Sequence, residues 1–297
     1  MIRPPKLIPG DTIALVSPAK AIEPSYIDFA KNYFENQGFK VLVGPNAGNQ
    51  FRYFSGTDQE RASDLQWAID HPEVKAIVCN RGGYGAVRLF DLVNWANLLR
   101  EPKWIVGFSD ITNFNCLGMR LGIETGHTSM PLNFRENSEE ALASLLNILR
   151  GEENKYTWNA HPMNKPGTAD GKVVGGNLSI LYSLLGTPYC PDFDQAILFI
   201  EDVGEQIYHL DRMLWAFRFA GVFDRIAGLI VGGMTDMKDT ATPTEWAMEE
   251  LILEHTKYNA FPIAFQSPVG HIPDNRAFIC GRVATFSVTE NQSYFIQ

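Results

Sequence analysis

The first half of the chain alternates short apolar segments with longer amphipathic ones. Four apolar runs without polar alternation, rich in β-branched residues, occupy residues 12–17, 40–44, 75–79 and 104–108. Runs of this kind are typical of parallel strands in a sheet that is covered on both faces. Amphipathic stretches between them indicate helices. One helix is expected to begin after Thr57, because Thr57 and Glu60 form a T-x-x-E capping box ahead of an apolar face.

This β-α-β-α order predicts an α/β fold with a doubly wound parallel sheet. Such sheets bind their ligands at the carboxyl ends of the strands. The loops after Cys79 and Phe108 therefore become the first places to look for a functional site.

The second half of the chain is less regular. Between residues 151 and 172 the composition becomes polar, with several prolines and glycines, and apolar periodicity disappears. We interpret this segment as a linker between a domain at 1–150 and a domain at 173–297. Beyond it, apolar runs at 196–200 and 226–231 predict strands, and a helix with one apolar face lies between them.

Two further features are expected near the carboxyl end. Thr242 as the cap, Pro243 in the first turn and Glu245 closing a capping box predict a helix start. From Phe261 onward, short alternating segments separated by turn residues indicate mixed or antiparallel strands.

Length and charge narrow the class of protein. A chain of 297 residues exceeds what one hydrophobic core usually organises, which favours two domains. With 45% hydrophobic and 20% charged residues it has the balance of a soluble globular protein. The net charge of −9 argues against nucleic acid or an anionic membrane surface as a partner, because both attract basic faces.

The sequence shows no pattern typical of export or of membrane insertion. The segment MIRPPKLIPGDTIALVSPA carries four prolines where a signal peptide needs an unbroken apolar stretch, and no apolar run approaches the ~20 residues that span a bilayer. Four widely separated cysteines without a C-x-x-C pair indicate reduced thiols. We therefore expect a cytoplasmic protein.

The segment G-F-S-D at 107–110 is the first candidate for chemistry. It follows a predicted buried strand and precedes a predicted helix, so Ser109 would lie on a tight strand-to-helix turn. Such a turn exposes the hydroxyl and points helix N–H groups at a developing oxyanion. The hydrolase elbow G-x-S-x-G would need a second glycine where Ile111 stands. On spacing alone, a helix cap is the favoured interpretation of Ser109.

The loop N-R-G-G-Y-G at 80–85 is the second candidate. Its glycines let the backbone approach a ligand and turn N–H groups toward negative charge. As a dinucleotide fingerprint it fails, because Arg88 stands where the third glycine is required. A simple turn would explain the glycines as well as a ligand does.

Acid and base candidates lie in the second half. His271 lies in the loop P-V-G-H-I-P-D-N, and Glu201 ends a predicted strand, where a carboxylate can orient an imidazole. His127 and His209 could also line a site. Both candidates have a plainer interpretation. A loop histidine is more often a solvated surface residue, and a carboxylate here can be a helix-start charge, which fits Glu205 better than Glu201. No ligand spacing for a metal is present.

Taken together, these segments resemble the LD-carboxypeptidase family of serine peptidases, which includes muramoyl-tetrapeptide carboxypeptidases and microcin C immunity proteins. The resemblance runs nearly end to end. The matching segments, in the family's order, are G-D-T-I-A-L-V-S-P-A at 10–19, R-G-G-Y-G at 81–85 with Arg88, G-F-S-D-I-T at 107–112, G-G-N-L-S at 175–179, E-D-V-G-E at 201–205 with Tyr208, Asp211 and Arg212, and G-H at 270–271. One departure is His127-Thr128-Ser129-Met130, where relatives tend to have His-Gly-Pro, and it bears on substrate preference more than on mechanism.

The resemblance implies a role for each matching residue. It makes Ser109 the nucleophile, Glu201 the acid of a triad and His271 the base, with backbone N–H groups of Gly83 and Asp110 as the oxyanion hole. It also implies a Rossmann-like amino-terminal domain, a β-rich, swivelling-barrel-like carboxy-terminal domain, an active site between them, and a homodimer. Arg81 and Tyr84 in the glycine loop would contact the substrate.

The implied reaction is hydrolysis through an acyl-enzyme, without a cofactor. The substrate would be a small murein tetrapeptide, cut between the L-centre of its diamino acid and a terminal D-alanine during cell-wall recycling. A free terminal carboxylate must then be held by local cations, because the protein is acidic overall, and Arg81 and Arg88 flank the glycine loop. Both arginines could instead be ion-pair partners. Two other functions stay open: an amide hydrolase like the microcin C immunity proteins, and a ligand-binding relative without catalysis.

Overall fold

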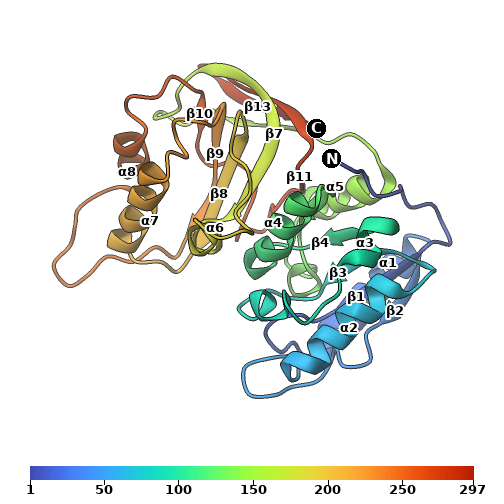
Figure 1. The fold of residues 1–297 in the computed structure, drawn as a ribbon. Helices are drawn as coiled ribbons and strands as arrows, with labels where there is room; N and C mark the ends of the chain where they lie inside the picture. The colour runs from blue at the N-terminus through green and yellow to red at the C-terminus, as the bar shows by residue number, and fades with distance from the viewer.

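The computed structural model describes residues 1–297 and contains two sheets (Figure 1). The first sheet has six strands in the order β11-β5-β4-β3-β1-β2. Their bounds are β1 (Thr12–Val16), β2 (Lys40–Val43), β3 (Val74–Cys79), β4 (Trp104–Val106), β5 (Thr125–His127) and β11 (Phe278–Cys280). Strands β1 to β5 pair in parallel, whereas β11 pairs antiparallel with β5. The predicted α/β fold with a parallel sheet in the first half is therefore confirmed.

Helices cover both faces of this sheet. Helices α1 (Pro24–Asn36) and α5 (Glu139–Arg150) pack on one face, and α2 (Asp58–Asp70), α3 (Ala96–Arg100) and α4 (Thr112–Leu121) pack on the other. The strands feed both cores because successive side chains point to opposite faces. In β1, Ile13 and Leu15 join the core with α1 and α5, and Ala14 and Val16 join the other.

The second sheet has seven strands in the order β10-β9-β8-β7-β12-β13-β6. Their bounds are β6 (Lys155–Asn159), β7 (Gly167–Asn177), β8 (Ile197–Val203), β9 (Gly228–Thr235), β10 (Ile263–Ala264), β12 (Val283–Val288) and β13 (Gln292–Ile296). Strands β7 to β10 pair in parallel and the remaining pairs are antiparallel, as expected of the tail. Helices α6 (Leu178–Leu184), α7 (Ile207–Phe219) and α8 (Met248–His255) bury their apolar residues against one face of it. The named ladders run from β10 to β6 without forming a continuous barrel, and an isolated antiparallel bridge between Ile263 of β10 and Lys165 joins this edge to the segment between β6 and β7.

Two predicted boundaries differ from the structure. The expected linker at 151–172 contains β6, an edge strand of the second sheet, and the beginning of β7, its central strand. In both segments, exposed polar residues alternate with buried ones. The helix expected to start at Thr242 begins at Met248 instead. Asp239 Oδ2 accepts hydrogen bonds from the backbone N–H and the hydroxyl of Thr244, so an irregular turn occupies the expected first turn. The division into two domains stays a prediction.

The two halves are joined by their packing. The largest hydrophobic cluster, of 45 buried residues, runs from α2 and α4 through α6 to α7 and α8. Strand β11 belongs to the carboxy-terminal half of the chain but completes the first sheet. No helix is long and apolar enough to cross a membrane.

Candidate active site

Ser109 lies on the turn that leads from β4 into α4. It has a left-handed backbone with φ of 60°, which non-glycine residues adopt at a cost, and it opens the short 3₁₀ helix η2 (Ser109–Ile111). The N-cap positions of η2 and α4 belong to Phe108 and Ile111, so Ser109 does not cap either helix. This strained turn presents a partly exposed hydroxyl at the carboxyl end of β4, as the sequence predicted.

The glycine loop after β3 packs against this turn. A Cβ atom added to Gly82 would lie 2.9 Å from Cβ and 3.1 Å from Oγ of Ser109. A second glycine, Gly83, has φ of 102°, which any side chain would strain. The loop therefore needs glycine because its backbone runs against the serine.

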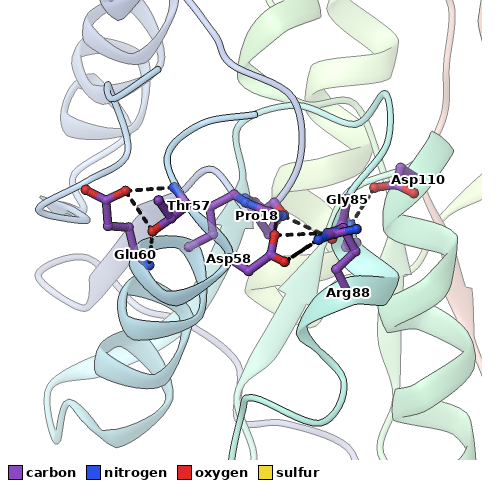
Figure 2. A network of polar contacts seen from close by, with 9 residues as sticks. Pro18, Thr57, Asp58, Glu60, Gly85, Arg88 and Asp110 are labelled. Atoms are coloured by element: carbon purple, nitrogen blue, oxygen red, sulfur yellow. Dashed lines mark hydrogen bonds and ion pairs between the residues drawn. The ribbon is translucent and has the colours of Figure 1, made fainter. Parts of the chain in front are cut away.

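Asp110 ties the glycine loop to the serine turn. Its buried carboxylate accepts a hydrogen bond from the backbone N–H of Ala86 at 2.8 Å and one from Asn113 at 3.1 Å. Burial raises the pKa of Asp110 above its usual value, although these donors and the charge of Arg61 oppose the shift. Figure 2 shows Asp110 reaching this loop next to Gly85.

A buried arginine that the sequence analysis missed supports the same loop. Arg61 of α2 is 1% exposed; its guanidinium donates to the carbonyl oxygens of Pro18 and Gly85, pairs with Asp58, and lies over the ring of Phe54. Thr57 and Glu60 form the expected capping box at the start of this helix (Figure 2). The signal that the sequence offered for this role was a charged residue, Arg61, on the apolar face of α2.

The two arginines beside the glycine loop have different environments. Arg88 is bound to Asp58 through Nε at 3.0 Å and Nη2 at 2.6 Å, as Figure 2 shows, and so is an ion-pair partner. Hydrogen bonding from Arg88 lowers the pKa of Asp58 below its usual value. Arg81 donates through Nη1 to the carbonyl oxygen of Ala21 at 2.9 Å. It lines a cavity of about 570 Å³ together with Lys20, Arg52 and Tyr53.

Tyr84 of the glycine loop lines a different hollow. It is 47% exposed and lines a groove of about 670 Å³ whose other walls include Phe90 and Asp110 from the first half and Ile180 from the second. The glycine loop thus contributes Arg81 to a basic cavity and Tyr84 to an apolar groove, and Asp110, the residue after Ser109, also lines the groove.

Glu201 and His271 come together from distant parts of the chain. Glu201, in β8, is fully buried, and its Oε2 lies 2.6 Å from Nδ1 of His271. Burial alone lowers the pKa of His271, but the charge of Glu201 and its hydrogen bond outweigh burial and raise the pKa above the usual value. The neighbouring Gly270 has φ of 108°, and a Cβ there would lie 2.5 Å from Cβ of Glu201. The Gly-His sequence therefore lets the loop approach the carboxylate.

His271 also packs against the serine turn. Its ring lies 4.8 Å from the ring of Phe108, centroid to centroid, and Phe108 directly precedes Ser109. The structure thus brings the Glu201–His271 pair against Phe108, the residue before Ser109. A serine hydroxyl, an imidazole and a buried carboxylate are the groups that acyl transfer through a serine requires.

Asp202 organises the neighbouring G-G-N-L-S turn, a role the sequence analysis did not assign. Its carboxylate accepts hydrogen bonds from Asn177 Nδ2 at 2.8 Å and the backbone N–H of Ser179 at 2.9 Å. Burial, helped by the charge of Glu201, raises the pKa of Asp202 to about 6. The backbone N–H of Asn177 donates to Thr112 Oγ1 at 3.0 Å, which links this turn to the helix after Ser109.

The other two candidate histidines make different contacts. His209 Nδ1 lies 2.5 Å from Glu205 Oε2, one turn into α7, and His127 is buried at the end of β5. All four cysteines are unpaired. No group of three or more His, Cys, Asp or Glu side chains is placed to hold a metal ion.

Comparison with known proteins identifies the family of this chain. Residues 13–128 match the LD-carboxypeptidase N-terminal domain, and residues 170–286 match the LD-carboxypeptidase C-terminal domain. The chain is 30% identical to the murein tetrapeptide carboxypeptidase of Pseudomonas aeruginosa over 92% of each protein. It is 27% identical to the microcin C7 self-immunity protein MccF of Escherichia coli over 75% of each.

A solved structure extends the likeness to the fold. The muramoyltetrapeptide carboxypeptidase from Oxalobacter formigenes superposes with a TM-score of 0.87 and 24% identity, covering 96% of this chain and 98% of that one. With both family domains matched in order and a 30% identical relative aligned over most of its length, this chain belongs to the LD-carboxypeptidase family of peptidases.

Proposed function

We propose that this protein is a serine carboxypeptidase that removes the terminal D-alanine from murein tetrapeptides, with Ser109 as nucleophile, His271 as base and Glu201 as the acid of the triad. The observation that carries the proposal is the 2.6 Å contact between buried Glu201 and His271, whose ring packs against the residue before Ser109. The relatives named as murein tetrapeptide carboxypeptidases support the choice of substrate.

In the first step Ser109 Oγ attacks the carbonyl carbon of the scissile bond while His271 Nε2 takes its proton. Glu201 holds Nδ1–H and stabilises the imidazolium, which is consistent with the raised pKa of His271. Backbone N–H groups of Gly83 and Asp110 receive the negative charge on the carbonyl oxygen. The amine of D-alanine then leaves with the proton from His271.

The second step releases the remaining peptide. Water loses a proton to His271 Nε2 and attacks the ester on Ser109, and the proton returns to Oγ as the ester bond breaks. No cofactor takes part in either step.

The substrate is oriented by the cavity and the groove that Arg81 and Tyr84 of the glycine loop line. The terminal carboxylate lies toward the cavity of Arg81, Lys20 and Arg52, which supplies cations in a protein of net charge −9. Tyr84 and the apolar groove receive the rest of the tetrapeptide. Arg88 is excluded from this role by its two-pronged contact with Asp58.

Cellular setting and assembly are part of the same proposal. We place the enzyme in the cytoplasm as a homodimer, acting on small peptides and binding neither nucleic acid nor membrane. Cell fractionation and light scattering of the purified protein test these two points. A monomer in light scattering would overturn the dimer.

The test of the activity is a side-by-side assay. Purified protein is incubated with a muramoyl tetrapeptide and with an aminoacyl-sulfamoyl adenosine, and the products are identified by mass spectrometry. We expect loss of one alanine from the tetrapeptide and none of this activity in Ser109→Ala. Cleavage of the adenosine compound alone would assign the protein to the same chemistry as MccF; cleavage of neither would favour a binding protein.

A further inference from the structure

His127 is a buried imidazole that the proposed reaction does not use. It is the last residue of β5, where it pairs with Phe278 of β11, and its side chain is fully buried. Burial lowers its pKa to about 4, against the opposing charge of Glu201, so the ring is neutral at physiological pH. A neutral imidazole has one N–H donor and one acceptor nitrogen.

The ring lies directly behind the proposed acid–base pair. Its face and edge contact Phe199 of β8 at 5.0 Å and Phe108 at 5.7 Å between ring centroids. Phe108 is the ring on which His271 also packs, and Phe199 lies two residues before Glu201. The charged groups that face His127 are Glu201 and His271.

Several buried polar atoms in this layer lack hydrogen-bond partners of ordinary geometry, although the Asn275 side chain lies close enough to the His127 ring to raise its pKa. They are both ring nitrogens of His127, Oε1 of Glu201 and Nδ2 of Asn275, and all four are buried. A buried polar atom left unpaired costs about 1–3 kcal/mol, so such atoms are normally satisfied. The set is complementary, because it holds donors on His127 and Asn275 and an acceptor on Glu201.

Asn275 is fixed by its other contacts. Its Oδ1 accepts the backbone N–H of Gly270 at 2.8 Å, and its carbonyl oxygen accepts the hydroxyl of Ser129 at 3.2 Å. The Asn275 side chain therefore contacts the loop of His271 through Gly270 and influences the His127 ring, and its amide nitrogen is buried without a partner. Oε2 of Glu201 is already bound by His271, which leaves Oε1 as the acceptor for this layer.

We propose that His127 is a positioning residue for Glu201: its neutral N–H, together with Asn275 Nδ2, holds Oε1 either directly or through one shared water molecule. Holding Oε1 fixes the carboxylate plane, and with it the direction of the bond from Oε2 to Nδ1 of His271. The inference rests on the proposed role of Glu201 and names no new contact with the substrate.

The first test compares two variants by steady-state kinetics. His127→Phe keeps a ring among the two phenylalanines but removes the donor, whereas His127→Gln keeps a neutral N–H donor. We expect kcat to fall about ten- to a hundredfold in His127→Phe with KM little changed, and to recover in part in His127→Gln. Unchanged kcat in His127→Phe, or equal losses in both variants, would overturn the proposal.

The second test does not depend on activity or on any variant. In nitrogen-15-labelled wild-type protein, the His127 ring should stay neutral from pH 5 to 9 and carry one exchange-protected N–H. A titrating or rapidly exchanging His127 contradicts the proposal even if the protein proves inactive on every peptide.

The same spectra separate positioning from general stability. The low-field Nδ1–H signal of His271 should broaden or move upfield in His127→Phe and return toward the wild-type position in His127→Gln. If that signal is unchanged in a folded His127→Phe protein, His127 acts only as a core residue. Failure of the proposed function would appear separately, as an intact signal with no peptide cleaved by the wild type.

Discussion

Replacing Glu201 by Gln tests the proposed triad because the chain offers a matched control. Glu205 and His209 form a second carboxylate–imidazole pair four residues away, with the same Oε2-to-Nδ1 contact at 2.5 Å. The two pairs differ in burial: Glu201 is fully buried, whereas the Glu205 side chain is 24% exposed. Because the same Glu-to-Gln change is made at both sites, a difference in activity reflects where the carboxylate lies and not which chemical group was removed.

The magnitude follows from the contact. Removing the charge from a buried, charge-assisted hydrogen bond costs about 1.5–3 kcal/mol, or roughly one to two decades in rate. The amide of Gln can also donate to Nδ1, which would leave the imidazole proton on Nε2, the nitrogen that must accept from Ser109. A wrong tautomer of this kind costs about 10⁴ in a serine triad. We expect kcat to fall about 10³- to 10⁴-fold in Glu201→Gln.

The control should behave differently. Glu205→Gln removes a partly exposed pair, whose contribution is about 0–1 kcal/mol, so kcat/KM should change by less than about fivefold. The assay measures D-alanine release from the tetrapeptide, with circular dichroism to confirm that both variants are folded.

The pH profile gives an independent readout. His271 must be neutral to accept a proton, so activity is lost as pH falls through its pKa, which Glu201 raises above the usual value. In Glu201→Gln the two raising influences of Glu201 are removed while burial remains, so the acid limb of kcat/KM should move to lower pH. Greater damage in Glu205→Gln, or an acid limb that stays in place or rises in Glu201→Gln, would refute the assignment.

Three further predictions concern the nucleophile, metals and the terminal carboxylate. Ser109→Ala should lower kcat by about 10³-fold or more without loss of thermal stability, and near-normal turnover would remove Ser109 from the mechanism. Dialysis against EDTA should leave turnover unchanged; loss of activity that zinc restores would contradict serine chemistry. A tetrapeptide with an amidated C-terminus should react about one to two decades more slowly than the acid, and Arg81→Ala, but not Arg88→Ala, should reduce this difference. Equal cleavage of acid and amide would mean that no terminal carboxylate is recognised.

Local sequence signals located most of the first sheet. The β-branched runs became β1 to β4, and the Thr57 capping box marks the start of α2. Both depend on neighbours within a few residues, which the sequence displays directly. The Thr242 signal failed because Asp239 competes for the same N–H groups, and no local rule ranks the two.

Features that depend on distant contacts were not visible in the sequence. Nothing in Phe278–Cys280 indicates that this strand would join β5 rather than its neighbours in the chain. The burial of Arg61 and the bond between Arg88 and Asp58 likewise depend on how α2 meets the glycine loop. Ser109, Glu201 and His271 were each ambiguous alone, and only the order of all six motifs singled them out. Their roles still stand as predictions.

Strand β11 limits how far the two sheets can move apart and how the chain can be cut into stable fragments. After His271 the chain crosses to the first sheet, where β11 pairs with β5, and then returns to the second sheet as β12. Short connecting segments on both sides of β11 therefore tie the base to the sheet that carries the serine. A wide hinge motion between the two sheets would break the β5–β11 ladder. We therefore expect a preassembled site that peptides enter and leave by diffusion. A fragment ending near residue 150 would leave the edge of β5 bare, with unpaired N–H and C=O groups ready to bind another strand. Such a fragment should self-associate, and a peptide spanning residues 275–282 should suppress that association.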